Sequence, residues 1–182
     1  MSRLVRIALA LALAALLGVL AWRAAGRHGL VRTTGTPAAD SAMAGLRPVA
    51  LWFADPGGDS LVVEVRDLPE QEGLHARLAQ LVDALARGPE RRGLAVLPTG
   101  TGLVHAFLDD RGLLTLDLSR PFTQGFHGGS REEDLVVGSL VRTLRANVPE
   151  AKRVLFTCAG APVGSLGGHL PLDRPIELHE AF

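Results

Sequence analysis

Two kinds of apolar pattern follow each other along this chain. From residue 48 onward, short runs rich in Val, Leu and Phe alternate with two longer stretches in which apolar residues return every three or four positions. Short β-favouring runs bounded by turn residues indicate strands, whereas the longer spacing is typical of amphipathic helices. Strands are expected at 49–54, 61–66, 103–108, 113–118, 154–158 and 170–178, the last limited by two prolines.

The two helical stretches have recognisable ends. The first is expected to stop at Gly88-Pro89. Its apolar stripe consists of Leu74, Leu78, Leu81, Val82 and Leu85. In the second, Ser130 followed by Glu133 has the form of a capping box, and Pro149 ends the helix. Because a sheet must cover each stripe, we predict an α/β domain of the α+β kind with two layers, a mixed β-sheet and two amphipathic helices packed on it.

The N-terminal region has a different pattern. Residues 7–22 form an uncharged apolar run behind Arg3 and Arg6. Its length lies between the core of a signal peptide, about 7–15 residues, and the roughly 20 residues of a spanning helix. We expect 1–22 to be an uncleaved membrane anchor, with a cleaved signal sequence or a buried globular helix as alternatives. Residues 23–47 are small and polar, typical of a flexible linker, which leaves 48–182 as the domain.

Charge and cysteine content exclude several classes of function. The 182 residues include nineteen basic and nineteen acidic side chains, but residues 1–48 hold six Arg against one acid, so the remainder is acidic. An acidic body binds phosphate backbones poorly, and we expect no nucleic-acid partner. The single cysteine, Cys158, excludes an intrachain disulfide and a multi-Cys zinc site. On an apolar strand it is expected to be buried and inert.

A series of short motifs runs through the body in a fixed order. The motifs lie at 81–89, 97–101, 114–119 with Phe122, 128–132, 140–144, 154–156 and 168–172. Each is unspecific alone, but their order and spacing across about residues 48–175 resemble the GerMN family, the sporulation and germination module of bacterial envelope proteins. The chain departs from the family at Cys158-Ala-Gly160, where a more ordinary polar strand end is expected, and it contains one module where some relatives carry two.

The resemblance implies a non-catalytic module that is tethered to the membrane by residues 1–22 and lies outside the cytoplasm, or is secreted or periplasmic if the leader is cleaved. It implies an envelope protein or a peptidoglycan-associated assembly as partner, and no cofactor or metal. Self-association into a homo-oligomer stays open. The motif residues that we single out for interaction are Gly88, Pro89, Pro98, Gly100, Thr101, Asp117, Ser119, Gly168 and His169.

Two other classes of function stay open. In an envelope hydrolase, Ser119 or Ser165 would be the nucleophile and His105 or His169 the base, although the sequence lacks a Gly-x-Ser-x-Gly elbow. A periplasmic glycan or small-ligand binder would use stacking aromatics. Aromatic residues make up only 4% of the chain and Tyr is absent, which disfavours that class.

For the polar motif residues we favour structural roles. Asp117 and Ser119 are expected to bond nearby backbone groups, Pro98 and Thr101 to bracket a turn, and His169 to satisfy buried backbone groups in its Gly-rich turn. In the first strand, the neighbours Trp52 and Phe53 face opposite sides, and one of the two is a candidate contact residue.

Two ligand sites are weighed against these structural roles. A metal site would have to gather its ligands from His105, His127, His169 and Asp173, which show no metal-ligand spacing. The glycine-rich residues 125–129 before the second helix are a candidate anion cradle, but acidic side chains follow directly and occupy that field.

Overall fold

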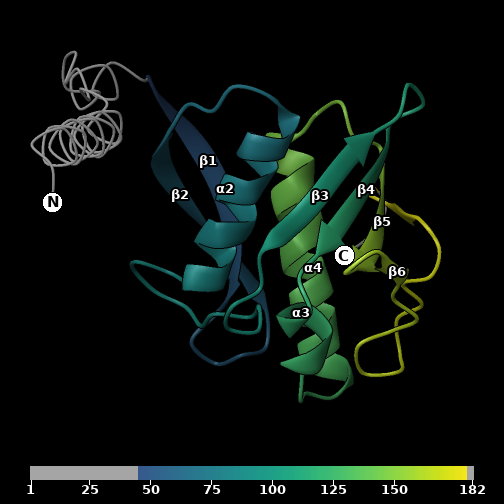
Figure 1. Cartoon of the computed structure of the whole chain (residues 1–182). Helices are drawn as coiled ribbons and strands as arrows, with labels where there is room; N and C mark the ends of the chain where they lie inside the picture. The colour runs from purple at the N-terminus through teal and green to yellow at the C-terminus, as the bar shows by residue number, and fades with distance from the viewer. Residues whose placement is uncertain (1–44, 180–182) are drawn as a thin grey trace, which may run out of the picture. The chain divides into compact units, whose positions relative to one another are not determined.

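The computed structural model describes residues 45–179, in which ten helices and strands follow one another (Figure 1). They are β1 (Leu46–Ala54), β2 (Leu61–Pro69), α2 (Leu74–Arg87), β3 (Leu103–Leu108), β4 (Leu113–Leu118), α3 (Pro121–Gln124), α4 (Ser130–Asn147), β5 (Arg153–Cys158), β6 (Ala161–Pro162) and β7 (Ile176–Glu177). The mixed α+β class and both long helices are confirmed, and Gly88 follows the last residue of α2 as predicted.

The strands form two sheets, whereas we predicted a single mixed sheet. β1 and β2 make a two-stranded antiparallel hairpin with nine paired residues, and β3, β4, β5 and β6 form a second sheet in which β4 and β5 run parallel. The hairpin cannot join the second sheet because the edge of β1 that faces away from β2 is occupied by side chains of α4.

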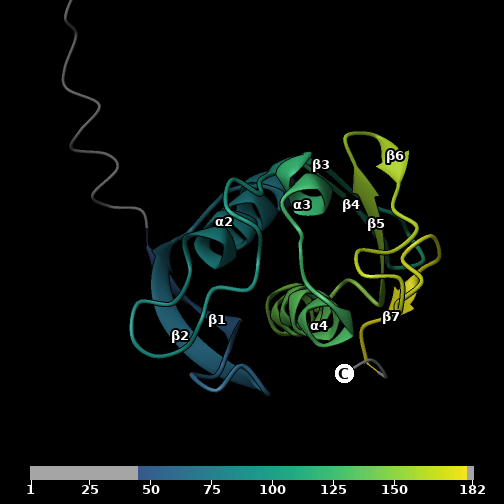
Figure 2. The same cartoon turned by 90° about the horizontal axis from the view of Figure 1, so that it is seen from below.

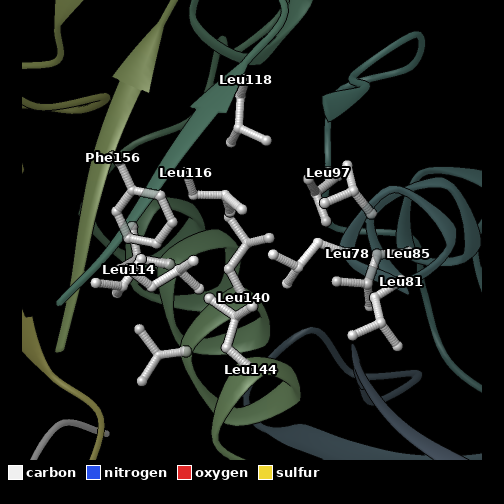
Figure 3. Packing of buried hydrophobic residues seen from close by; sticks show 14 of the residues in the cluster. Leu78, Leu81, Leu85, Leu97, Leu114, Leu116, Leu118, Leu140, Leu144 and Phe156 are labelled. Carbon is white, nitrogen blue, oxygen red and sulfur yellow. The ribbon is translucent and has the colours of Figure 1, made fainter. Parts of the chain in front are cut away.

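The core lies where α2 and α4 pack between the hairpin and the second sheet (Figure 2). Leu140 and Leu144 of α4 lie between Leu114 and Phe156 of the second sheet on one side and three leucines of α2 on the other, namely Leu78, Leu81 and Leu85 (Figure 3). All of these side chains are almost completely removed from solvent. Burial of this apolar surface is the main favourable contribution to folding, and it fixes the helices as the platform for the loops described below.

The start of α4 differs from the prediction by one residue. The N-cap is Gly129, whose N–H donates to Glu132 Oε2 at 3.0 Å, so the residue that reaches back is Glu132 and not Glu133. This shift turns Glu133 toward the interior, where its side chain is fully buried. The predicted capping box between Ser130 and Glu133 is therefore wrong, because the carboxylate of Glu133 lies in the interior of the domain and does not reach back to the start of the helix.

Three smaller elements also differ, and one of them is the two-residue strand β6, which was not predicted. The expected last strand at 170–178 shrinks to β7, two residues that pair with β5, because Pro171 and Pro175 lack the N–H groups that a ladder needs. The short helix α3 was not predicted. None of the helices within 45–179 is long and apolar enough to cross a membrane; the expected anchor at 1–22 and nearly all of the linker lie outside the described residues.

Candidate functional site

The loop that begins at Gly88 and Pro89 is held by a buried ion pair in β2. Arg66 Nε donates to Glu64 Oε1 at 2.5 Å, and Arg66 Nη2 donates to the carbonyl oxygen of Gly88 at 2.7 Å. The Glu64 carboxylate also accepts the N–H groups of Glu90 and Arg91, each at 3.1 Å. Burial raises the pKa of Glu64, but the Arg66 guanidinium and these two N–H groups outweigh it and hold the pKa below its usual range.

The turn at 98–101 is held by Ser119. Thr101 donates both its N–H, at 3.1 Å, and its hydroxyl, at 2.7 Å, to the carbonyl oxygen of Pro98. Ser119 Oγ accepts the N–H of Gly102 at 2.9 Å and donates to the carbonyl oxygen of Gly100 at 3.3 Å. The predicted turn is confirmed, and the Ser119 hydroxyl is engaged as both donor and acceptor.

Asp117 fixes the connection between β5 and β6. Its side chain is only 7% exposed. Asp117 Oδ1 accepts the hydroxyl of Thr157 at 2.9 Å and the N–H of Gly160 at 2.8 Å. Gly160 has a φ of +81°, which an L-residue rarely adopts. Asp117 therefore does bond a backbone N–H, but that group lies 43 positions away in the chain, so the near neighbour that we predicted as its partner is wrong.

Glu133 is the carboxylate that organises the glycine-rich loop around His169. Its side chain is fully buried and accepts the backbone N–H groups of Leu166 at 2.7 Å, His169 at 2.8 Å and Leu170 at 3.2 Å. Burial raises the pKa of Glu133, but the surrounding N–H groups together outweigh it and keep the pKa below its usual value. The N–H groups of the loop at 166–170 thus bind the carboxylate of Glu133, an anion of the chain itself.

This arrangement reverses the role that we predicted for His169. Instead of its imidazole satisfying buried backbone groups, its backbone is satisfied by Glu133, and the imidazole is mainly exposed. The His169 Nδ1 atom lies 3.1 Å from the carbonyl oxygen of Gly167 and 3.7 Å from Glu133 Oε2. The neighbouring Gly168 has a φ of +88°, which suits a residue without a Cβ.

The alternative chemistries gain no support from these positions. Within the described part of the chain, no three His, Cys, Asp or Glu side chains gather as metal ligands, so the structure does not bring His105, His127, His169 and Asp173 together. The glycines before α4 do not form an empty anion cradle, because the N–H of Gly129 is taken by Glu132.

Cys158 and Ser165 line a shallow hollow of about 430 Å³ at the end of β5. Cys158 is half-buried rather than buried, and its Sγ atom lies 3.4 Å from the Thr123 hydroxyl. Arg120 also lines the hollow. Among the residues that the structure describes, none of the histidines lines the hollow beside Ser165 as a base.

The two edges of the β1–β2 hairpin differ sharply. Asp55 N–H donates to the carbonyl oxygen of Ser60 at 2.8 Å. The hydrogen-bonded pairs of the ladder therefore join odd-numbered residues of β1 to even-numbered residues of β2, and the backbone groups of the other residues point away from the partner strand. On the outer edge of β1, the backbone groups of Ala50, Trp52 and Ala54 are all engaged. Their partners are Asn147, Thr143 and Ser139 of α4 and the backbone of Leu94.

The outer edge of β2 has no such cover. Its outward backbone groups belong to Leu61, Val63, Val65 and Asp67, and within residues 45–179 none of them is hydrogen-bonded. The side chains of Val63 and Val65 are each 54% exposed. They are register partners of Trp52 and Ala50, so the hairpin presents an apolar outer face beside an unpaired edge. Edges of this kind are templates for binding another chain.

A basic hollow adjoins this face. It measures about 420 Å³ and is lined by Trp52, Arg142, Arg145 and Ala146. Of the two neighbours that we considered in the first strand, Phe53 is fully buried and Trp52 is half-exposed. The candidate contact residue is therefore Trp52.

Sequence reasoning missed the polar residues that hold this architecture. Ser139, Thr143 and Asn147 occupy one line of α4 with a spacing of four residues, next to its apolar stripe. That spacing was a readable signal, because it places all three side chains on the same face of the helix. Glu64 and Arg66 alternate with exposed valines in β2, which is the pattern of a strand that buries its charged face.

Comparisons with known proteins agree with this fold. The tandem GerMN domains of the sporulation protein GerM from Bacillus subtilis superpose with a TM-score of 0.59 at 20% identity, covering 72% of this chain and 46% of that one. The first GerMN domain of the same protein gives 0.61 at 20% identity, with coverages of 74% and 99%. A protein from Clostridium perfringens gives 0.51 at 20% identity, with coverages of 76% and 92%.

These solved structures bear on the fold alone, and the family is established by sequence. None of the curated proteins matches the chain significantly. Residues 50–164, more than half of the chain, match the family model described as Germane, sporulation and spore germination. The chain therefore belongs to the Germane family and carries a GerMN-like domain.

Proposed function

We propose that this chain is a membrane-tethered, non-catalytic interaction module of the bacterial cell envelope. Residues 1–22 hold it at the membrane, and the domain outside the cytoplasm binds an envelope protein or a peptidoglycan-associated assembly. The observation that carries the proposal is that some polar groups are hydrogen-bonded within the chain whereas others are available to a partner. Among the motif side chains, Thr101, Asp117 and Ser119 bond the chain's own loops, while the β1–β2 hairpin leaves backbone groups and apolar side chains available.

The engaged groups argue for binding rather than catalysis. A nucleophile needs a base that can take its proton, yet the Ser119 hydroxyl is bonded to Gly100 and Gly102. The buried carboxylates of Glu64, Asp117 and Glu133 each bond at least two partners within the chain. Groups committed in this way shape a scaffold and have little freedom to act on a substrate.

The available groups argue for a protein partner. Glycan recognition relies on stacking aromatics, and the hairpin offers only Trp52. An unpaired strand edge beside exposed valines suits another polypeptide, because main-chain hydrogen bonds supply affinity and the side chains supply specificity.

The test uses the full chain with a C-terminal epitope tag, expressed in its own organism. Envelope fractionation and protease treatment of intact spheroplasts should place the tag in the membrane fraction and outside the cytoplasm. Chemical crosslinking before extraction should then co-purify a discrete partner. A variant that lacks residues 1–22 is the matched control and should lose both the membrane association and the partner. Recovery of the full chain in the cytoplasm, or the absence of any crosslinked partner, would reject the proposal.

A further inference from the structure

We propose that the open edge of β2 binds an extended segment of a partner protein in which apolar and acidic side chains alternate. The inference rests on the proposed function and names the surface and the partner chemistry through which the module acts. It combines three observations: an unpaired edge, an apolar outer side and a basic inner side.

The edge of β2 is long enough and regular enough to accept another strand. All nine pairs between β1 and β2 follow one register without a bulge. The outward backbone groups of Leu61, Val63, Val65 and Asp67 have no hydrogen-bonding partner within residues 45–179. Proteins usually protect such edges with charges, prolines or bulges. Here the residues in the middle of the edge with outward backbone groups are valines, the inward charges of Glu64 and Arg66 are buried and paired with each other, and the nearest exposed charge of the strand is Asp67.

The two sides of the edge require different side chains. Successive side chains of an added strand point to opposite faces of the sheet. On the outer side they would lie beside Val63 and Val65, which are 54% exposed and are backed by Trp52 and Ala50 in β1. Apolar side chains suit this position, because they remove these valines from water.

The inner side is basic. The carboxylate of Glu64 accepts the N–H groups of Glu90 and Arg91 at 3.1 Å, which places the loop around Arg91 and Arg92 beside the middle of β2. Both arginine side chains are exposed, and neither forms an ion pair with any residue in 45–179. Among the nearby charges, Arg66 pairs with both Glu64 and Glu90, which leaves one negative charge in excess, so Arg91 and Arg92 give the inner side a net charge of one positive unit. Acidic side chains on the partner would complement the two remaining arginines.

A second copy of this chain satisfies only part of this surface. Its own β2 would supply Val63 and Val65 on the outer side. On the inner side it would supply Glu64 and Arg66, which are buried and paired within each molecule. The inward residues of its β2 would therefore bring no free carboxylate to Arg91 and Arg92, and its own loop would bring two further arginines beside a Glu90 that already pairs with Arg66. The charge on the inner side thus favours a foreign acidic segment over self-association.

The experiment measures peptide binding to the full chain, purified in a non-ionic detergent. The probes are two fluorescein-labelled nine-residue peptides, one alternating Val and Glu and the other alternating Val and Lys. Fluorescence polarisation should show at least tenfold tighter binding of the Val-Glu peptide at low salt. Raising the ionic strength should reduce that preference, because salt screens exposed charges. Equal binding of the two peptides, or binding of neither, would overturn the proposal.

Two pairs of variants assign the binding to this edge. Val65→Pro removes an outward N–H that β1 does not use, and we expect it to weaken Val-Glu binding at least tenfold. Phe107→Asp alters an exposed apolar residue on the other sheet and should leave binding unchanged. Arg91→Glu combined with Arg92→Glu should invert the preference between the peptides, whereas Arg111→Glu, in the exposed turn before β4, should not. The charge-reversal pair decides the question if Val65→Pro fails to fold.

The remaining outcomes separate this inference from the proposed function. If sedimentation reveals a dimer that Val65→Pro abolishes while no peptide binds, the edge belongs to a second copy and the inference is wrong. If the crosslinked partner in cells is captured equally by wild type and by Val65→Pro, the module binds elsewhere, which overturns the inference and leaves the proposed function intact. If wild type captures no partner at all, the proposed function itself fails.

Discussion

The side-chain amide of Asn147 in α4 pairs with the backbone of Ala50 in β1 as a neighbouring strand would. Asn147 Oδ1 accepts the Ala50 N–H at 3.1 Å, and Asn147 Nδ2 donates to the Ala50 carbonyl oxygen at 2.7 Å. Thr143 and Ser139 bond the N–H and C=O of Trp52 in the same manner. Side chains of α4 thus occupy the outer edge of β1, and the outer edge of β2 is the unpaired edge of the hairpin.

Removing this pairing should destabilise the domain. Asn147→Ala leaves the N–H and C=O of Ala50 without partners, and we expect the free energy of unfolding to fall by about 2 kcal/mol. Equilibrium urea unfolding followed by circular dichroism measures the change. Arg145→Ala alters an exposed residue of the same helix and should stay within about 0.5 kcal/mol of wild type. Equal stability of the two variants would show that Asn147 does not support β1.

Glu133→Gln should destabilise the loop at 166–170 in a pH-dependent way. Folding holds the pKa of Glu133 below its value in the unfolded chain. Its contribution is therefore present above the unfolded pKa of about 4.3 and is lost as the pH falls through the lower, folded value. At neutral pH the variant should be about 2 kcal/mol less stable than wild type, since hydrogen bonds to a charged group are lost.

Urea unfolding at a series of pH values from 7 to 3 tests this expectation. The difference in unfolding free energy between wild type and Glu133→Gln should be constant at neutral pH and should shrink below about pH 4.3. Glu72→Gln, which changes an exposed residue before α2, should alter stability little at neutral pH. A difference that stays constant down to pH 3 would contradict the assigned role of Glu133.

Two glycines with positive φ should respond differently to alanine. Gly93 has a φ of +124°, and a Cβ there would lie 2.7 Å from the carbonyl oxygen of Ala54. Gly58 has a φ of +72° with open space around it. Gly58→Ala should cost about 1 kcal/mol, the usual strain of a left-handed residue, and Gly93→Ala clearly more. Thermal unfolding monitored by circular dichroism ranks the two, and the reverse order would contradict the described packing of the loop.

Ser119→Ala separates the structural role of this hydroxyl from a catalytic one. The substitution removes an acceptor for Gly102 and a donor to Gly100, and we expect it to lower the unfolding free energy by about 1 kcal/mol. Hydrogen exchange at the Gly102 amide should accelerate. Hydrolysis of p-nitrophenyl acetate should match the uncatalysed rate for wild type and variant alike. Turnover by wild type that disappears in the variant would instead support the hydrolase alternative.

Local patterns predicted much of this fold. The spacing of leucines and valines located both long helices, and the Gly88-Pro89 pair marked where α2 ends. Turn residues separated the strands of both hairpins correctly. These features depend on neighbouring residues, so they can be read from one stretch of sequence at a time.

Long-range polar contacts could not be predicted in this way. Asn147 bonds a residue 97 positions away, and Glu133 bonds N–H groups 33 to 37 positions away. Such contacts determine that the strands form two sheets and that Glu133 turns inward rather than capping α4. The polar residues of the motifs could be named, but the carboxylate around which the His169 loop folds was assigned to a helix cap. Its partner groups are backbone amides, which carry no signal in the sequence.

The central claim is that one edge of the hairpin is occupied by α4 while the other is available for binding. Amide hydrogen exchange, read residue by residue by NMR in the free protein, tests it most directly. We predict strong protection at Ala50 and Trp52 and, within β2, protected amides at Glu64 and Arg66 alternating with rapidly exchanging amides at Val63 and Val65. Uniform protection along β2 would contradict the account, because it would mean that the second edge is already paired.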